Sequence, residues 1–266
     1  MHKIFTNLFP EAIKKGAIEI FGEQSMQPVL IELVPAPMLP SEPILALLHK
    51  NEAAALSNYR LPKRRSEYLT GRICAKTAVR ELYILTNTPS TPRTLSEIEI
   101  INAENGRPKV CVHALKNDTL KLDISISHSG DYGAALAAGS YCGIDLQLKR
   151  NNLLKIKEKY CCEAEDKLLE TFLSDMDILT RLALLWTAKE AAKKALSHWQ
   201  MPGFLDLEAG ELKTFAHYTA FTLHVINTKS QLMPKEVTVV AGIFGEYALA
   251  ICLIDKDRSN AGITRG

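Results

Sequence analysis

The sequence predicts an α+β protein made of two similar halves in tandem. Two short matches support this prediction: Ala75-Lys76-Thr77-Ala78 resembles Ala188-Lys189-Glu190-Ala191 (188 − 75 = 113), and Gly130-Asp131-Tyr132 resembles Gly245-Glu246-Tyr247 (245 − 130 = 115). Each match alone carries no weight, but their shared order and nearly equal spacing favour a duplicated unit of a helix followed by strands. The second half would begin near Cys142, and the seam between two such halves is a natural ligand cleft.

The individual elements follow from periodicity and turn residues. Apolar residues at helical spacing predict helices over 63–85 and 163–199, the second broken near Ser174-Asp175, and a helical stretch over 42–56. Prolines between 28 and 43 limit 29–34 to a loop or an edge strand. Further strands are expected at 97–101, 122–127, 133–138, 142–148, 221–226, 237–244 and 247–253, with a turn at Asn105-Gly106.

Composition excludes several classes of protein. The 266 residues are 47% hydrophobic and 23% charged with a net charge of +2, so a phosphate-binding function must rest on local clusters. No uncharged apolar run reaches about 18 residues, which argues against a membrane span. The six cysteines show no zinc-site spacing, and reduced thiols suit a reducing cytosol, so we expect a cytoplasmic protein.

Asp145 and Gln147 are the first candidate ligands. In a strand over Gly143-Ile144-Asp145-Leu146-Gln147, the aliphatic side chains point one way and the polar side chains the other. A carboxylate held in this way suits Mg²⁺, which prefers oxygen donors. On its own, however, the pattern fits an ordinary amphipathic strand better.

Glu190 and Lys194 are the second candidates. Leu182, Trp186, Glu190 and Lys194 recur every four residues, so they form one helix stripe that is apolar at its start and charged at its end. The carboxylate could bind a metal or take a proton, and the ammonium could reach a phosphate. Without further context, a routine Glu-to-Lys helix pair explains the spacing better.

A cluster of basic residues is the third candidate site, and the end of a strand is the fourth. Arg65, Arg72 and Lys76 share a helix face within a cluster that also includes Lys63, Arg64 and Arg80. Arginine suits phosphate groups, while a solvated helix face is an equal alternative, and sparse aromatics argue against nucleic acid. Ser127 and His128 end a strand, where the histidine is either structural or a donor to an anion.

In this order, the four pieces resemble the Sfp-type 4'-phosphopantetheinyl transferases, in particular the enterobactin-type branch. The resemblance covers 63–199 and rests on five segments: 63–72 (KRRSEYLTGR), 105–108 (NGRP), 125–129 (SISHS), 143–145 (GID) and 186–194 (WTAKEAAKK). It implies two pseudo-twofold-related α+β halves with the active site at their seam. Residues 1–141 would bind the phosphates of coenzyme A, and 142–266 would bind Mg²⁺ and catalyse the reaction.

The resemblance also implies a role for each candidate residue. Asp145 and Glu190 would ligate Mg²⁺, with Gln147 facing the metal where the family often has a second acid, and Lys194 would contact the transferred phosphate. Arg65, Arg72, Arg107, Ser127 and His128 match the family's nucleotide-phosphate positions. The enzyme would be a monomer that moves the 4'-phosphopantetheine arm of coenzyme A to a serine of an acyl or peptidyl carrier protein, with Glu190 as general base directly or through water.

Two alternatives remain open from the sequence. Gln147 carries no charge where the family often has an acid, which allows a non-catalytic coenzyme A or nucleotide-binding protein of the same fold. A protein-interaction module that uses the basic helix would bind a partner without metal or coenzyme A.

Overall fold

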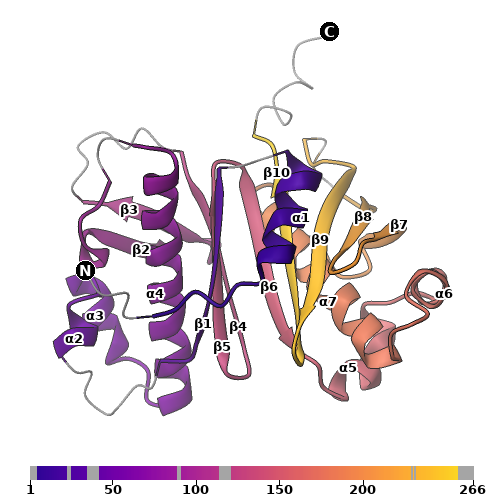
Figure 1. Ribbon diagram of the computed structural model, residues 1–266, viewed down its shortest axis with the longest axis horizontal. Helices are drawn as coiled ribbons and strands as arrows, with labels where there is room; N and C mark the ends of the chain where they lie inside the picture. Colours follow the sequence, from indigo (N-terminus) through magenta and orange to yellow (C-terminus); the bar gives the residue numbers. More distant parts are fainter. Residues whose placement is uncertain are drawn as a thin grey trace, which may run out of the picture. The chain divides into compact units, whose positions relative to one another are not determined.

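The computed structural model describes residues 5–22, 25–34, 42–88, 91–113, 121–228, 230 and 232–256. They form two compact units, each of mixed α and β structure (Figure 1). The first unit holds 25–139 together with the start of the chain, and the second holds 10–24 and everything from Ser140 onward. None of the helices in the described ranges combines the length and apolar content needed to cross a bilayer.

The first unit is built around one long helix on a small antiparallel sheet. Its strands run in the order β1 (Met26–Glu32), β5 (Tyr132–Ala138), β4 (Asp123–Ser129), and α4 (Pro62–Leu85) packs on them. Pro62 stands at the start of α4, where a missing N–H costs nothing. The hairpin β2 (Ile98–Asn102) and β3 (Pro108–Val112), the 3₁₀ turn Leu95–Glu97 and the short helices α2 (Glu42–Leu45) and α3 (Lys50–Leu56) complete the unit.

The second unit repeats this plan with a larger sheet. The strand order is β6 (Tyr141–Leu148), β10 (Tyr247–Ile254), β9 (Glu236–Phe244), β8 (Thr219–Val225), β7 (Leu207–Thr214), and α7 (Ile178–Leu196) packs on β6 and β10. The helix α6 (Glu163–Phe172), the single turn α5 (Asn152–Lys155) and the 3₁₀ turn Lys157–Lys159 precede α7 in sequence. The predicted break near Ser174 is therefore confirmed.

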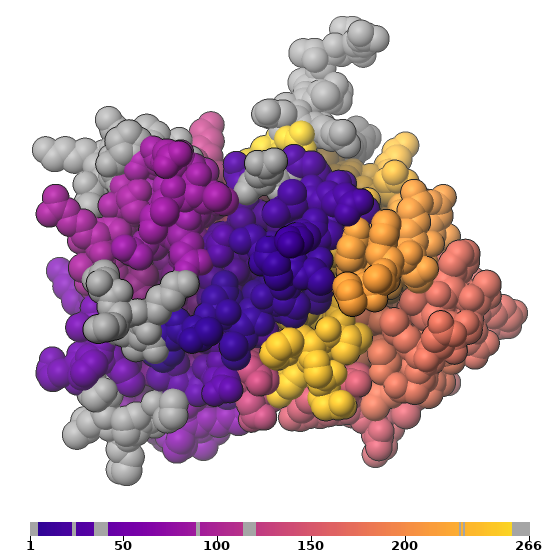
Figure 2. Space-filling model, viewed as in Figure 1, coloured from indigo at the N-terminus to yellow at the C-terminus, as the bar shows by residue number. Residues whose placement is uncertain are grey.

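The N-terminal helix belongs to the second unit although it precedes the first in sequence. α1 (Glu11–Phe21) lies against β9, where a Cβ on Gly242 would fall 2.8 Å from Ile13 Cδ1. A Cβ on Gly16 would fall 2.5 Å from the ring of Tyr218, so glycine allows the close approach at both contacts. Figure 2 shows the indigo atoms of α1 beside the orange atoms of this region. The sequence did not predict this helix, nor the strands β3 and β7.

Small residues let each long helix lie close to its sheet. In the first unit, Ala135 and Ala137 of β5 join the core under α4. In the second, Ala248 and Ala250 of β10 lie in the core with the alanines of α7. The close packing of backbone on backbone buries the sheet face that carries these small residues.

A buried ion pair ties the short helix to the long helix in the first unit. Lys76 of α4 is fully buried, pairs with Glu52 of α3 and donates to the carbonyl of Leu47 at 2.9 Å. Glu52 also accepts the N–H of His49 at 2.9 Å, which closes a capping box, and the N–H of Ile100 at 3.0 Å. Lys76 is therefore an internal residue, so it does not form part of a basic helix face with Arg65 and Arg72 that a ligand or solvent could reach.

The second unit contains the same set of contacts 113 residues later (165 − 52 = 113). Fully buried Lys189 pairs with Glu165 at 2.7 Å and donates to the carbonyl of Tyr160, also at 2.7 Å. Glu165 accepts the N–H of Cys162, again in a capping box, and the N–H of Ala209. The same offset of 113 relates four kinds of residue in the two units: the buried lysine, its glutamate, the N-cap residue and the residue whose carbonyl accepts from the lysine. These shared contacts confirm the predicted repeat.

Candidate active site

The close approach of β6 to α7 creates the site. A Cβ on Gly143 would lie 1.9 Å from the carbonyl oxygen of Ala191 and 2.9 Å from the backbone nitrogen of Ala195. Only glycine fits there. Because side chains alternate along a strand, Asp145 and Gln147 project to the same side as Gly143, toward the helix. The predicted polar side of the strand is therefore the side that faces α7, and the aliphatic Ile144 and Leu146 point away from the helix.

Asp145 and Lys194 meet across this contact. Lys194 Nζ donates to Asp145 Oδ1 at 2.7 Å and to the carbonyl of Ile144 at 2.9 Å. The Asp145 side chain is only 8% exposed, while Lys194 is 24% exposed and reaches the surface. The ammonium group is therefore oriented by two acceptors on the strand and still has access to solvent.

Glu190 lies one helical turn before Lys194 on the same face of α7. Its Oε1 accepts from Lys193 Nζ at 2.8 Å, and its side chain is 24% exposed. The predicted stripe runs from the core to the surface, since Leu182 at its start is fully buried while Glu190 and Lys194 at its end are partly exposed. The carboxylate and the ammonium thus stand at the open end of a stripe that begins in the core.

Phe204 is a neighbour of the site that the sequence analysis missed. Lys193 Nζ lies 3.8 Å from the centre of its ring, and the ring packs against Trp186 at 4.3 Å between centroids. The carbonyl of Phe204 also accepts from Lys189 at 3.2 Å. Phe204 lies in the segment after α7, and no local pattern marks it.

The donors of this unit suit a hard divalent cation. Asp145 and Glu190 offer carboxylate oxygens, and Gln147 offers an amide oxygen while its amide nitrogen donates to the carbonyl of Leu148 at 2.8 Å. Mg²⁺ is typically bound by one or two carboxylates together with substrate phosphates. The charges of the four side chains Asp145, Glu190, Lys193 and Lys194 sum to zero. Because the side chains alone supply no net negative charge, binding of a cation is favoured most strongly when an anionic ligand binds with it.

In the first unit, two arginines have buried nitrogen atoms with no hydrogen-bond partner. These atoms are Nε of Arg65 and Nε of Arg72. The Arg72 guanidinium lies 4.6 Å above the ring of Tyr68 and donates to Asn102 through Nη2 at 3.3 Å. Its Nε makes no hydrogen bond but forms an ion pair with Glu52 Oε1 at 3.9 Å. Burial raises the pKa of Tyr68, so the ring under the guanidinium is a neutral phenol. A buried polar atom without a hydrogen bond calls for an explanation, and arginine suits anionic ligands.

The remaining three predicted phosphate ligands differ in their surroundings. Arg107 is buried, and its Nη2 donates to both oxygens of Asp123 at 3.0 and 2.9 Å. Ser127 is buried within β4, whereas His128 is exposed and its Nδ1 lies 3.7 Å from Glu67. No pattern in the sequence marks Asp123 as the partner of Arg107, because Asp123 lies 16 positions away at the start of β4.

The match to a family model lies in the second unit. Residues 141–252 match the family model described as the 4'-phosphopantetheinyl transferase superfamily. This segment contains Asp145, Gln147, Glu190 and Lys194, and it leaves the first unit unmatched. No curated protein matches the chain.

Two solved structures resemble part of the chain. The acyl carrier protein synthase of Mycobacterium tuberculosis is 21% identical over 42% of this chain and 92% of its own, with a TM-score of 0.29. The holo-[acyl-carrier-protein] synthase of Thermotoga maritima is 20% identical over 49% of this chain and 72% of its own, with a TM-score of 0.32.

Proposed function

We propose that this protein transfers the 4'-phosphopantetheine arm of coenzyme A to a serine of an acyl or peptidyl carrier protein. The observation that carries the proposal is the contact of Asp145 with Lys194, one turn from Glu190, within the segment that matches the transferase superfamily. The earlier expectation of an Sfp-type or enterobactin-type enzyme remains part of this proposal, as do a cytoplasmic location and a monomeric state.

The reaction is a phosphoryl-type transfer, which depends on positioning and charge neutralisation. The serine hydroxyl attacks the β-phosphate of coenzyme A, an Oγ–P bond forms, and the bond to 3',5'-ADP breaks. Glu190 takes the hydroxyl proton. Lys194, held by Asp145 and the carbonyl of Ile144, stabilises the charge that develops on the phosphoryl oxygens.

Mg²⁺ held by Asp145, Glu190 and the amide oxygen of Gln147 would neutralise charge on the pyrophosphate. Arg65 and Arg72 bind the nucleotide's phosphates in this proposal, which is supported by the absence of a hydrogen-bond partner at the Nε atom of each. Ser127 and His128 add hydroxyl and imidazole donors. Arg107 keeps its place in the proposal as a residue whose contact with Asp123 would orient it.

The decisive experiment is a loading assay. Apo acyl and peptidyl carrier proteins are incubated with coenzyme A and Mg²⁺, and the carrier mass is followed for the gain of one phosphopantetheine group. We expect Glu190→Ala to lower the rate by at least about a hundredfold with the fold intact, because a transition-state interaction is lost at a partly exposed site. Glu163→Ala is the matched control, since that glutamate also pairs with a lysine on an exposed helix face.

Two outcomes would contradict the proposal. Loading by Glu190→Ala at the wild-type rate would remove Glu190 from the mechanism. Binding of coenzyme A by the wild-type protein without loading of any carrier would favour the alternative, a non-catalytic coenzyme A-binding protein of this fold, to which the uncharged Gln147 points.

A further inference from the structure

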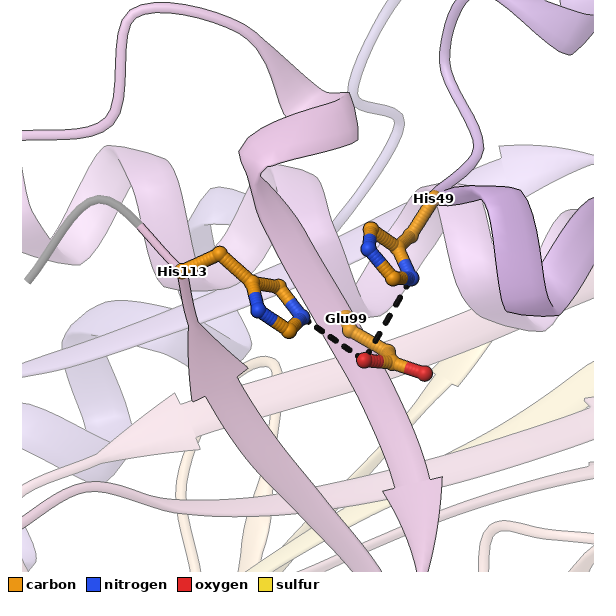
Figure 3. A group of neighbouring side chains, drawn as sticks. All are labelled: His49, Glu99 and His113. Carbon is orange, nitrogen blue, oxygen red and sulfur yellow. Dashed lines mark hydrogen bonds and ion pairs between the residues drawn. The ribbon is translucent and has the colours of Figure 1, made fainter.

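Two histidines and a glutamate converge in the first unit, at a place that the proposed transfer reaction does not use. Glu99 lies on β2, His113 directly follows β3, and His49 is the N-cap of α3. Figure 3 shows both imidazole rings directed at the Glu99 carboxylate. Their ligand atoms all lie within 4.8 Å of one another.

Both rings approach the same carboxylate oxygen. His113 Nε2 is 2.7 Å and His49 Nδ1 is 3.3 Å from Glu99 Oε2. The other carboxylate oxygen, Oε1, accepts from Asn51 Nδ2 at 2.8 Å, which fixes the direction of the carboxylate. A hydrogen bond of this kind to a ligating carboxylate is typical of metal sites.

Rigid elements hold the three side chains in place. Glu99 is paired with Cys111 in the β2–β3 ladder, and the backbone N–H of His113 continues that ladder by donating to the carbonyl of Glu97 at 3.0 Å. The backbone of His49 is fixed by its capping hydrogen bond to Glu52. Little side-chain reorganisation is therefore needed for an ion to be bound.

The two imidazole rings lie parallel to each other within this cluster. They are stacked at 4.3 Å between centroids and 10° between planes. The His49 Nδ1 lone pair receives the N–H of Asn51 at 3.5 Å, the outer limit of a hydrogen bond, and this contact is weak enough to be displaced by a cation.

We propose that His49, Glu99 and His113 bind a divalent transition-metal ion, with Zn²⁺ as the best-fitting member of the class. Two imidazole nitrogens and one carboxylate oxygen form a zinc ligand set with one position left for water. The His113 side chain is 45% exposed, so the ion and the water reach the site from that side. The oxygen donors of the second unit suit Mg²⁺ instead, and the two sites therefore select different ions.

The bound ion links the start of α3 to the β2–β3 hairpin. Glu52, in the first turn of α3, pairs with Lys76 and stands 3.9 Å from Arg72. Metal binding would therefore fix the end of α3 that carries the buried ion pair. A gain in thermal stability of the folded chain is the direct consequence.

The test uses the full-length chain, freed of metal by a chelator, and Zn²⁺ or Co²⁺ alone as the probe. Calorimetry and metal analysis should show one equivalent bound by the wild-type protein, and Zn²⁺ should raise its melting temperature. His113→Ala should weaken binding at least tenfold and abolish the thermal shift, and since His113 is exposed the variant should fold. His224→Ala is the matched control, because His224 is also exposed and lies 3.7 Å from a glutamate, Glu236.

Co²⁺ distinguishes this site from adventitious binding by the cysteines. The Co²⁺ complex should lack the near-ultraviolet band of a thiolate ligand, and excess Mg²⁺ should not displace the ion. Equal affinity of the wild-type and His113→Ala proteins, or a thiolate band that is unchanged in His113→Ala, would overturn the proposal. Neither readout involves carrier loading, so a failure of the proposed transferase activity would leave this result intact.

Discussion

Lys76 and Lys189 are residues whose burial could not be recognised in the sequence. Both appear in the sequence as ordinary helical lysines, one within a basic cluster and one beside the candidate Glu190. Both are fully buried in the structure and pair with a capping-box glutamate. Burial lowers the pKa of Lys76, although Glu52 acts against this effect.

We predict that Lys189→Met destabilises the protein by about 3–5 kcal/mol, because Glu165 would be left as an uncompensated buried charge. The double change Glu165→Gln with Lys189→Met should cost less than Lys189→Met alone, since no buried charge remains. Urea unfolding measures both. Lys167→Met serves as the control: its pair with Glu163 is exposed on both sides, and its loss should cost no more than about 1 kcal/mol. Equal effects of Lys189→Met and Lys167→Met would contradict the structural role given to Lys189.

At the scale of elements, the position of α7 on β6 depends on Gly143. We predict that Gly143→Ala destabilises the protein by about 1–3 kcal/mol or more, since its Cβ would meet the rigid backbone carbonyl of Ala191 at 1.9 Å. The matched control is Gly71→Ala in α4, where the Cβ would meet only a methyl group, Ile126 Cγ2, at 3.1 Å.

The Gly71→Ala variant should be tolerated far better, because a side-chain methyl can move and alanine favours a helix. Thermal unfolding compares the two variants. Equal tolerance of both changes would mean that β6 and α7 can separate at no cost.

The start of α7 is held by Asp177. Its carboxylate accepts from the hydroxyl of Thr180 at 2.6 Å and from the Thr180 N–H at 3.0 Å, and these hydrogen bonds lower the pKa of Asp177. Because the folded-state pKa is lower than the unfolded-state value, the ionised cap adds stability above about pH 3.9, and this stability is lost as the pH falls through the folded-state pKa.

We therefore predict that Asp177→Ala costs about 0.5–2 kcal/mol at neutral pH, and that the difference from wild type narrows as the pH falls below about 4. Asp177→Asn should keep most of the cap without titrating, so its stability relative to Asp177→Ala should not depend on pH. Urea unfolding at several pH values provides the measurement. A wild-type advantage over Asp177→Ala that stays constant to the lowest pH would refute the role of the ionised carboxylate.

At the scale of the whole chain, the two units share the same structural scaffold but differ in the charged residues that it carries. The positions 113 residues before Glu190 and Lys194 hold Thr77 and Glu81. Glu81 accepts a hydrogen bond from Gln27 at 2.7 Å, in contrast to the Lys194–Asp145 ion pair. Both copies of the repeat therefore have the same scaffold, while the candidate site residues Asp145, Glu190 and Lys194 lie in the second copy.

This asymmetry predicts that variants in the two units affect different kinetic constants. Arg72→Ala should mainly raise KM for coenzyme A, by about tenfold or more, because a charge-assisted contact to a phosphate is lost. Glu190→Gln should mainly lower kcat. Steady-state loading with varied coenzyme A separates the two effects, and Arg64→Ala controls for charge, since Arg64 is an exposed arginine on the same helix that pairs with Glu67. A lowered kcat with unchanged KM in Arg72→Ala would contradict its role in nucleotide binding.

The sequence by itself determined the α+β class and the repeat, because periodicity and local motifs are properties of neighbouring residues. The set Asp145, Glu190 and Lys194 came from the resemblance to a family, and its role in catalysis stays a prediction. Only the tertiary structure decided which charges are buried and which meet. Lys76 is buried in the core, and Arg107 pairs with Asp123. His49 at the start of α3, Glu99 on β2 and His113 just after β3 come together. Such contacts join residues between 14 and 64 positions apart, and no periodic pattern in the sequence encodes a partner at that distance.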